Sequence, residues 1–231
     1  MRAIGDFEEM AVPLEAPSSA NAPGKLSELL LKDRAVTTFE KDQVIYDAPE
    51  RTPTLFFVRS GFVKVGAIME DGHELIYDLR TRGDVVGELC ASNHRRQDRA
   101  VALVTSEIVA TPYEEVLAAA QRDRGLMREF VEMFCDPLSD TYGQLSAVAH
   151  GDVVTRLARV LRRLAAKIGR PVGAYTELPV HLTQETIAQM VAMRRERVSW
   201  TMNRLRRRGV LDYSRGGYIV LDLDALSAYS S

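Results

Sequence analysis

Residues 181–209, HLTQETIAQMVAMRRERVSWTMNRLRRRG, have the pattern of two short helices joined by a tight turn. Thr183 is a good N-cap because its hydroxyl accepts a hydrogen bond from a free backbone N–H, and Glu185 stands in the first turn, where the helix dipole favours an anion. A break near Met193 leads into the second helix. The apolar residues that give the two helices buried faces are Ile187, Met190, Val191, Val198, Met202 and Leu205.

The exposed face of the second helix carries a high density of arginine. Residues 194–208 contain seven arginines and one acidic residue. Arg195 can bridge O6 and N7 of guanine and Glu196 can accept from N4 of cytosine, which is the chemistry of a recognition helix in the major groove. Arg206–Arg208 at the far end suit phosphates; a merely solvated helix face is the alternative. The candidate DNA-binding residues are Thr183, Arg194, Arg195, Glu196, Arg197, Ser199, Trp200, Arg204 and Arg215.

A short hairpin is expected after the second helix. Gly209 is a helix stop, since glycine accepts the left-handed conformation of a C-cap. Leu211–Tyr213 and Tyr218–Leu221 then have the pattern of two strands around the turn Ser214–Gly217. We interpret this hairpin as the wing of a winged helix-turn-helix, with Arg215 at its tip within reach of a phosphate.

The charge of the chain divides near residue 150. Residues 1–150 carry 16 Lys and Arg against 25 Asp and Glu, whereas residues 151–231 carry 14 against 7. The formal net charge of −2 therefore hides an acidic N-terminal part and a basic C-terminal part. A basic unit of this size favours double-stranded DNA as its partner, and chance surface charge is the competing explanation.

The N-terminal part has the pattern of a closed antiparallel sheet. Short apolar runs alternate with turn residues, and Asp71-Gly72 is a strong hairpin signal because glycine accepts a positive φ at little cost. Many short strands in succession are typical of a rolled sheet rather than of a βαβ fold. The expected strands are Val36–Phe39, Gln43–Tyr46, Thr54–Arg59, Phe62–Ile68, Glu74–Leu79, Val85–Gly87, Val101–Val104 and Ile108–Thr111.

A long helix is expected between the two parts. Asp136-Pro137 looks like an N-cap followed by proline at the first helical position, and no proline occurs from Leu138 to Ile168. A helix of about 30 residues is roughly 45 Å long. A small domain does not bury such a length, so we expect a second copy of the chain to cover its apolar stripe, with burial in its own domain as the alternative. The stripe is Leu138, Tyr142, Leu145, Val148, Ala149, Leu157, Val160, Leu161 and Leu164.

These parts predict an α+β chain of four segments. They are a flexible N-terminal arm (1–24), a jelly-roll-like β-roll (25–136), a dimerisation helix (137–168) and a winged helix-turn-helix DNA-binding domain (169–231). The family resemblance described below implies that the β-roll is an effector domain. No stretch approaches the roughly 18 apolar residues of a membrane span, and the N-terminus lacks the pattern of a signal peptide. The two cysteines are too few for a disulfide framework or a four-thiolate metal site. We expect a cytoplasmic protein without a membrane partner or a bound metal.

The order of these parts resembles the CRP/FNR superfamily of bacterial transcription regulators, from about Leu30 to the C-terminus. The most specific match is Leu182–Leu211, with Arg195 and Glu196 where the family places base-reading residues. The resemblance implies a sequence-specific regulator that is gated by a small effector, reads an inverted-repeat operator as a homodimer and has RNA polymerase as a further partner.

Three motifs of the N-terminal part carry the same resemblance. FFVRSGFVKV (56–65) resembles the β-roll signature of the superfamily. GDVVGEL (83–89), followed by QDRA (97–100), resembles the phosphate-binding cassette of the members that bind cyclic nucleotides. The effector-binding residues that the resemblance implies are Gly87, Glu88, Leu89, Arg99, Ala100 and Thr141.

A cyclic phosphate needs a cation and N–H donors, which Arg99 and the cassette backbone would supply, and Glu88 would accept from the ribose hydroxyl. By resemblance Thr141 would contact the base. The chain departs from the pattern at Ala100, where the family has serine; a lost hydroxyl bond costs about 1–3 kcal/mol when its partner stays buried. Tyr142 is also bulky for its position. Cyclic AMP or cyclic GMP is the candidate ligand, and a structural relic or a site for another ligand is the alternative.

Other functions were weighed on the same residues. A regulator that senses redox state or haem would use Cys90 or Cys135, or one of His73, His94, His150 and His181. An iron–sulfur sensor is not expected, since no cysteine precedes Cys90. A nucleotide-binding module without DNA binding conflicts with the arginine-rich helix. No nucleophile–base pair, metal cluster or phosphate loop indicates an enzyme.

Overall fold

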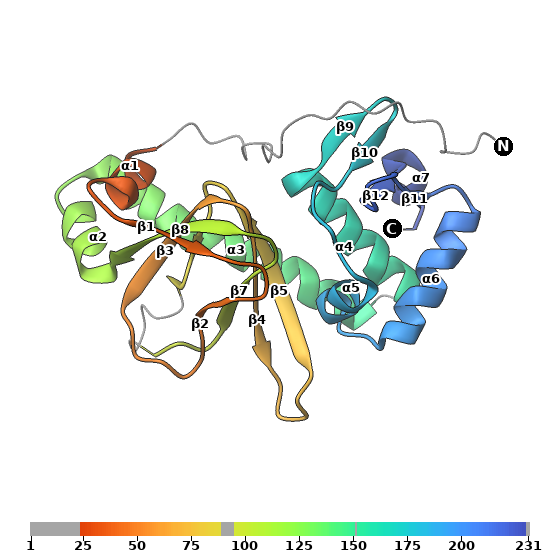
Figure 1. Ribbon diagram of the computed structural model, residues 1–231, viewed down its shortest axis with the longest axis horizontal. Coiled ribbons are helices and arrows are strands. Elements are labelled where there is room, and N and C mark those ends of the chain that lie inside the picture. The colour runs from red at the N-terminus through yellow and green to blue at the C-terminus, as the bar shows by residue number, and fades with distance from the viewer. Residues whose placement is uncertain (1–23, 89–94, 151, 230–231) are drawn as a thin grey trace. The chain divides into compact units, whose positions relative to one another are not determined.

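The computed structural model describes residues 24–88, 95–150 and 152–229 (Figure 1). The chain forms two compact units, one that ends at Gly143 and one that begins at Gln144. The division into four functional segments stays a prediction. Within the described ranges, no helix combines the length and the apolar character needed to cross a bilayer.

The first unit is an antiparallel β-roll with helices at its ends. Two four-stranded sheets form it, in the orders β1-β8-β3-β6 and β2-β7-β4-β5. The predicted hairpin is confirmed, because β4 pairs with β5 and Gly72 between them has a φ of 84°. The elements are α1 (Lys25–Leu31), β1 (Val36–Phe39), β2 (Val44–Tyr46), β3 (Thr54–Ser60), β4 (Phe62–Ile68), β5 (Glu74–Thr81), β6 (Val85–Val86), β7 (Arg99–Ala102), β8 (Ser106–Pro112), α2 (Tyr113–Ala120) and the greater part of α3 (Arg124–His150).

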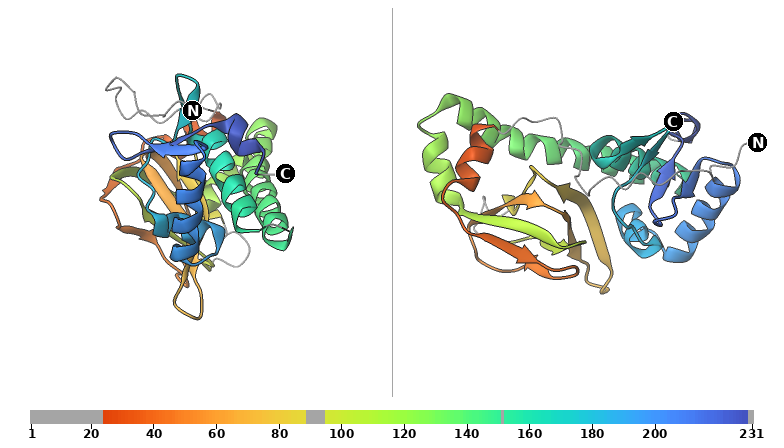
Figure 2. Two further views of the ribbon diagram at one scale, coloured as in Figure 1. Left: turned by 90° about the vertical axis from the view of Figure 1, so that its right-hand side faces the viewer. Right: turned by 45° about the horizontal axis from the view of Figure 1, so that its top comes forward.

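All eight predicted strands are present, two of them with the predicted bounds and the others with ends that differ by one or two residues. The helices of this unit pack on one sheet, where α1, α2 and the start of α3 share a core with β3 and β8 (Figure 2). A second apolar cluster lies between the two sheets, since Tyr46, Val58, Val65 and Val86 meet there. These two apolar cores stabilise the β-roll, which encloses the polar groups described below.

The start of the long helix is the main correction to the sequence-based expectation. Helix α3 begins at Arg124, so the prediction that Asp136-Pro137 caps its start is wrong, and Pro137 lies inside the helix. Asp123 provides the cap, because its Oδ1 accepts from the backbone N–H of Gly125 at 2.7 Å. A proline inside a helix removes one hydrogen bond. Burial of the preceding turn in the β-roll core, through residues such as Phe130, stabilises the helix despite this loss.

The second unit combines helices with a small four-stranded sheet of order β11-β12-β10-β9. The wing strands are confirmed, whereas β9 and β10 lie where no strand was predicted. The two strands pair because Gly173, with a φ of 61°, turns the chain between them. The elements are α4 (Val153–Ile168), β9 (Arg170–Val172), β10 (Tyr175–Glu177), α5 (Gln184–Val191), α6 (Arg195–Arg207), β11 (Leu211–Tyr213), β12 (Ile219–Leu221) and α7 (Leu223–Ser227).

The predicted apolar stripe divides between two helices. A new helix, α4, begins after Asp152, whose side chain accepts from the backbone N–H of Thr155 at 2.8 Å. The prediction of one helix through to Ile168 is therefore wrong, because this cap starts a separate helix. The second unit itself covers the C-terminal part of the stripe, which agrees with the alternative of burial within its own domain. The buried residues of this part are Leu157, Val160, Leu161 and Leu164.

Candidate functional site

The turn between α5 and α6 fixes the helix-turn-helix. Thr183 Oγ1 accepts from the backbone N–H of Thr186 at 3.0 Å, which confirms the predicted N-cap. Ala192 ends α5 in the left-handed conformation, with a φ of 52°. Arg156 of α4 donates from Nη2 to the carbonyl oxygen of Val191 at 2.6 Å. The end of α5, and hence the start of α6, is anchored to α4.

Helix α6 has one buried and one exposed face. Arg195 and Glu196 occupy its first turn, and both side chains are exposed. Ser199 is half-buried, and Trp200 is 60% exposed although it is a large aromatic residue. The polar first turn therefore faces solvent while the opposite face packs within the unit. The buried residues of the helix are Val198, Thr201, Met202 and Leu205.

The arginines at the far end of α6 differ in their partners. Arg206 Nε donates to Asp212 Oδ1 at 2.7 Å. Arg208 Nη1 donates to the hydroxyl of Tyr229 at 2.9 Å. Arg207 between them is exposed. Two of the three arginines assigned to phosphates from the sequence thus also brace the second unit internally.

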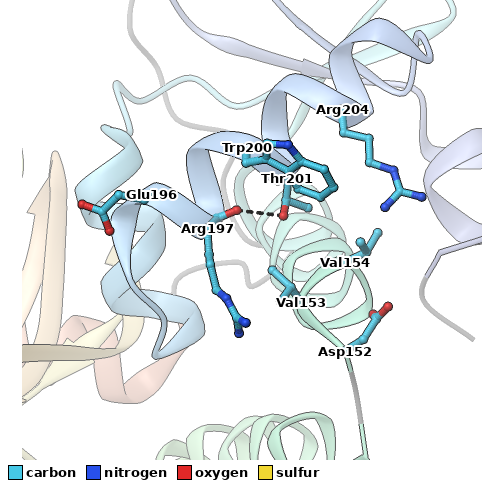
Figure 3. Close-up of a pocket in the computed structure, with 8 residues that line it drawn as sticks. All are labelled: Asp152, Val153, Val154, Glu196, Arg197, Trp200, Thr201 and Arg204. Carbon is cyan, nitrogen blue, oxygen red and sulfur yellow. Dashed lines mark hydrogen bonds between the residues drawn. The ribbon is translucent and has the colours of Figure 1, made fainter.

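A surface groove of about 480 Å³ runs between the start of α4 and one flank of α6 (Figure 3). Arg204 lies on this flank with its guanidinium carbon 5.6 Å from the ring centroid of Trp200. A hydrogen bond from the backbone N–H of Thr155 holds the pKa of Asp152 below its usual value. The groove is lined by Asp152, Val153, Val154, Glu196, Arg197, Trp200, Thr201 and Arg204.

The remaining predicted DNA-binding residues are also exposed. Arg194 directly precedes α6 and Arg197 lies in its first turn, next to the base-reading candidates. Arg215 stands at the tip of the hairpin between β11 and β12, where Ser214 N donates to the carbonyl oxygen of Tyr218 at 2.9 Å. The structure thus brings all the cations of the candidate interface onto one unit.

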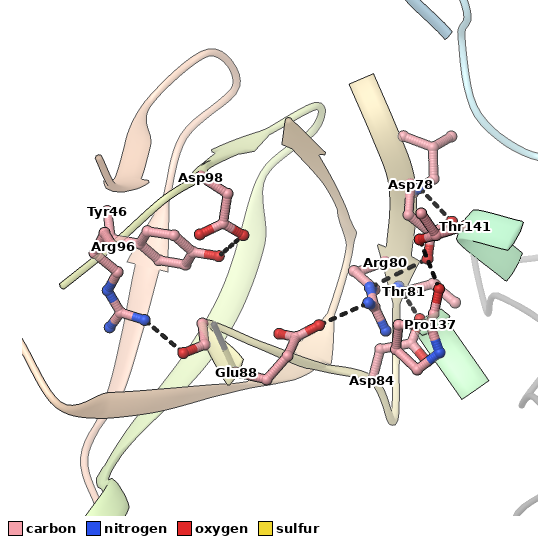
Figure 4. A network of polar contacts seen from close by, with 12 residues as sticks. Tyr46, Asp78, Arg80, Thr81, Asp84, Glu88, Arg96, Asp98, Pro137 and Thr141 are labelled. Carbon is pink, nitrogen blue, oxygen red and sulfur yellow. Dashed lines mark hydrogen bonds and ion pairs between the residues drawn. The ribbon is translucent and has the colours of Figure 1, made fainter. Parts of the chain in front are cut away.

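In the β-roll, the predicted acceptor for a ribose hydroxyl already has a partner. Glu88 follows β6, is 8% exposed, and accepts from Arg80 Nη2 through Oε1 at 2.9 Å. Arg80 Nε also lies 3.2 Å from Asp78 Oδ2. No described residue bonds the other oxygen of Glu88, Oε2, which is buried. The pair Arg80–Glu88 is thus a buried ion pair of the β-roll (Figure 4).

The predicted phosphate ligand, Arg99, stands at the start of β7 and forms an ion pair with Asp47 at 3.6 Å. Ala100 beside it is fully buried. Thr141 lies on α3, where its exposed hydroxyl donates to the carbonyl oxygen of Pro137 at 2.8 Å. Leu89 lies outside the described residues. A ligand role for these residues stays a prediction.

The sequence analysis missed the most deeply buried cation of the β-roll. Arg96 is 1% exposed, and its guanidinium lies 4.2 Å from the ring centroid of Tyr46 and 5.3 Å from that of Phe56. Its Nη1 donates to the carbonyl oxygen of Gly87 at 2.7 Å and its Nη2 to that of Thr54 at 2.6 Å. The only signal in the sequence is that Arg96 ends the basic run before Gln97-Asp98-Arg99.

Asp98 completes this polar interior (Figure 4). Its Oδ2 accepts from the Tyr46 hydroxyl at 3.1 Å, and no described residue bonds its buried Oδ1. Burial raises the pKa of Asp98 to about 6, and the negative charge of Glu88 adds to the rise. Burial likewise raises the pKa of Tyr46 well above its usual value.

The described residues of the redox and haem alternatives lie on different segments of the chain. Cys135 is exposed on α3, His73 is exposed after the turn at Asp71-Gly72, and His181 stacks on Tyr218 with ring centroids 4.3 Å apart. Cys90 and His94 lie outside the described residues, as does the side chain of His150. Among the residues that the structure describes, no group of three or more His, Cys, Asp or Glu side chains is arranged to hold a metal ion.

Comparisons with known proteins agree for both units. Residues 36–123 match the cyclic nucleotide-binding domain family, and residues 155–229 match the Crp-like helix-turn-helix domain family. The chain is 25% identical over 195 residues to the global nitrogen regulator of Synechocystis sp., covering 83% of this chain and 87% of that protein. It is 25% identical over 194 residues to the CRP-like cAMP-activated global transcriptional regulator of Mycobacterium tuberculosis, covering 84% and 83%.

The solved structure of FixK2 from Bradyrhizobium japonicum has the same fold, with a TM-score of 0.76 at 21% identity, over 86% of this chain and 98% of that one. The β-roll, the helix-turn-helix with its wing and the two family matches agree with one another. The chain belongs to the CRP/FNR superfamily of DNA-binding transcription regulators, which join an effector-binding β-roll to a C-terminal helix-turn-helix.

Proposed function

We propose that the chain acts as a homodimer that reads an inverted repeat in duplex DNA with the first turn of α6. The observation that carries this proposal is the exposed position of Arg195 and Glu196 at the start of a helix whose opposite face is buried. An arginine so placed can form two hydrogen bonds with guanine, and a glutamate can accept one from cytosine. Two such helices about 34 Å apart would enter successive major grooves on one side of the DNA.

Phosphate contacts would set the position of the reading helix on the duplex. Arg197 and Arg204 flank the groove beside α6, and Arg215 stands at the tip of the wing. Contacts of this kind raise affinity without selecting sequence, and they make binding depend steeply on salt. Arg206 contributes less in this scheme, because Asp212 already partly neutralises its guanidinium.

The dimer would form through the exposed apolar face of α3. Val131 and Leu138 are each 50% exposed and Tyr142 is 61% exposed, and with the exposed Cys135 they recur at spacings of four, three and four residues. This spacing is that of the seam of a two-stranded coiled coil. A second copy of the same helix is the occupant that such a seam fits, since the pattern is self-complementary about a twofold axis.

The β-roll would regulate the DNA-binding unit. A cyclic nucleotide is one candidate effector, supported by the cyclic nucleotide-binding domain match and by the name of the mycobacterial relative. The ion pairs that Glu88 and Arg99 form with Arg80 and Asp47 favour the alternative of a regulator that needs no cyclic nucleotide. RNA polymerase in the cytoplasm would be the protein partner of the bound dimer.

The test begins with selection of duplexes from a random library by the wild-type protein. Arg195→Ala is then expected to weaken binding to the selected duplex by about 1–3 kcal/mol and binding to random DNA much less. Arg207→Ala is the matched control on the same helix, and it should weaken binding to both duplexes alike. Equal losses for Arg195→Ala on both duplexes, or no selected sequence at all, would contradict the proposal.

The dimer is tested separately by sedimentation. Leu138→Glu places a charge in the proposed seam and should give monomers, whereas Glu132→Gln on the same helix should leave the dimer intact. A wild-type protein that sediments as a monomer at micromolar concentration would rule out this part of the proposal.

A further inference from the structure

We propose that Arg96 is an intramolecular ligand of the β-roll. Its guanidinium occupies the interior and bonds Gly87, which, with the next residue Glu88, is one of the cassette residues that family resemblance assigns to a cyclic nucleotide. On this reading the domain carries its own cation at this place and does not bind cyclic AMP or cyclic GMP. The inference concerns the β-roll alone, so it does not depend on how α6 reads DNA.

The first argument is the chemistry of the groups that hold Arg96. The Tyr46 and Phe56 rings present their faces to the guanidinium, an arrangement that favours a cation. The carbonyl oxygens of Gly87 and Thr54 accept hydrogen bonds from the two terminal nitrogens of Arg96, at 2.7 and 2.6 Å. Carbonyl oxygens have no proton to donate, so they cannot bond the oxygens of a phosphate. The pocket is built for a planar cation with two N–H groups.

The second argument is the backbone at Gly87, which has a φ of 89°. A Cβ atom added at this position would collide with Nη1 of Arg96, and it would also lie 3.0 Å from the carbonyl oxygen of Thr54. Glycine therefore allows both the left-handed backbone and the close approach of the guanidinium. The cassette glycine, which resemblance alone would connect with a phosphate, here makes room for an arginine.

The third argument is the balance of buried charge. Glu88 and Asp98 each keep one buried oxygen that no described residue bonds, and the Nε atoms of Arg80, Arg96 and Arg99 are also buried without a hydrogen bond. The other cations of the region have acidic partners: Arg80 pairs with Glu88 and Asp78, and Arg99 pairs with Asp47. A cyclic phosphate would bring a further negative charge next to these carboxylates, while Arg80 and Arg99 already pair with acidic groups, and burial of an unbalanced charge is costly. Among the residues that the structure describes, those around Arg96 do not fit a cyclic nucleotide.

The first experiment uses the wild-type protein. Calorimetric scans of the full chain with and without about 1 mM cyclic AMP or cyclic GMP should give the same transition temperatures, because a ligand bound to the folded state at this excess would raise that of the β-roll. A rise that Arg99→Leu abolishes would overturn the proposal. This experiment needs no substitution at Arg96, so it tests whether the β-roll binds a cyclic nucleotide even if variants at that position fail to fold.

The second experiment replaces the side chain by a free molecule. Arg96→Ala should lower the transition temperature of the β-roll, and added ethylguanidinium should restore part of the loss by entering the vacated site. Arg82→Ala, at an exposed arginine of the same domain, should show neither effect. Gly87→Ala should destabilise the wild-type chain more than it destabilises the Arg96→Ala background, where the collision with Nη1 is gone and only the strain of the positive φ and the contact with the Thr54 carbonyl oxygen remain.

Failure of this proposal is distinct from failure of the proposed DNA binding. A stable Arg96→Ala protein that is indifferent to ethylguanidinium would refute the internal ligand while leaving the binding of α6 to selected duplexes untouched. Conversely, a chain that selects no DNA sequence would still show the loss and rescue of the β-roll transition if Arg96 acts as proposed.

Discussion

The raised pKa of Asp98 gives the β-roll a pH dependence of unusual sign. The folded state holds this proton more tightly than the unfolded chain, because burial and the charge of Glu88 raise the pKa from 3.8 to about 6. Between these two values the folded protein binds more protons than the unfolded protein, so the free energy of unfolding must fall as the pH rises. A shift of about two pKa units at about 1.4 kcal/mol per unit makes the loss about 3 kcal/mol by pH 7.

Asp98→Asn isolates this contribution. Asparagine keeps an oxygen that accepts from the Tyr46 hydroxyl, and it carries no charge at any pH. Near pH 7.5 the variant should therefore be more stable than the wild-type protein by up to about 3 kcal/mol, which corresponds to roughly 10 °C in the β-roll transition. Near pH 4 the two proteins should converge, because the wild-type carboxyl is then protonated.

Scanning calorimetry of both proteins from pH 4 to pH 8 measures the difference. Glu70→Gln, which removes an exposed carboxylate from the same unit, is the control and should follow the wild-type curve. The reasoning would be refuted if the stability difference between Asp98→Asn and the wild-type protein were the same at every pH. It would also be refuted if the advantage of the variant over the wild type were smaller at pH 7.5 than at pH 4.

Three further predictions concern the helices. Thr183→Ala removes the cap of α5 and should lower the stability of the second unit by about 1 kcal/mol in urea denaturation. Ala192→Gly should raise the stability of the second unit by about 0.5–1 kcal/mol, because glycine adopts the left-handed conformation without strain. Ala188→Gly inside α5 should lower the stability by a similar amount. A loss of stability for Ala192→Gly would contradict the left-handed conformation at this position. Mild oxidation should cross-link the proposed dimer through Cys135. The cross-link should be absent from Cys135→Ser and from the Leu138→Glu monomer. A cross-link that survives Leu138→Glu would place the dimer contact elsewhere.

The DNA-binding unit could be predicted from sequence because its signals are local. An N-cap at Thr183, a break before Arg194 and a glycine at 209 each act within one turn of chain, and the structure has all three. The eight strands of the β-roll were likewise visible from turns and alternation. The two extra strands, β9 and β10, were missed because Pro171 and Gly173 are typical of an irregular segment. Pairing of the two strands with each other, and of β10 with β12, stabilises them.

The long helix and the polar interior could not be predicted because their causes are not local. Asp123 starts α3, and the β-roll core stabilises its first turns, so the stronger-looking signal at Asp136-Pro137 gave the wrong start. Arg96 looks like one more surface arginine, and its burial depends on Tyr46, Phe56 and Gly87, which stand far from it in sequence. The groups that hold its charge are carbonyl oxygens and ring faces, and nothing in the sequence marks such groups as partners of a cation.

The small sheet of the second unit constrains how a signal can act. Its strands come from both sides of the helix-turn-helix, since β9 and β10 precede α5 while β11 and β12 follow α6. The bond from Arg156 to Val191 fastens the same assembly to α4. Any rotation of α4 must then move α6 and the wing with it as one rigid body. In the proposed dimer, regulation would change where the two DNA-binding units lie on the duplex, while the fit of each unit to its own half-site stays unchanged.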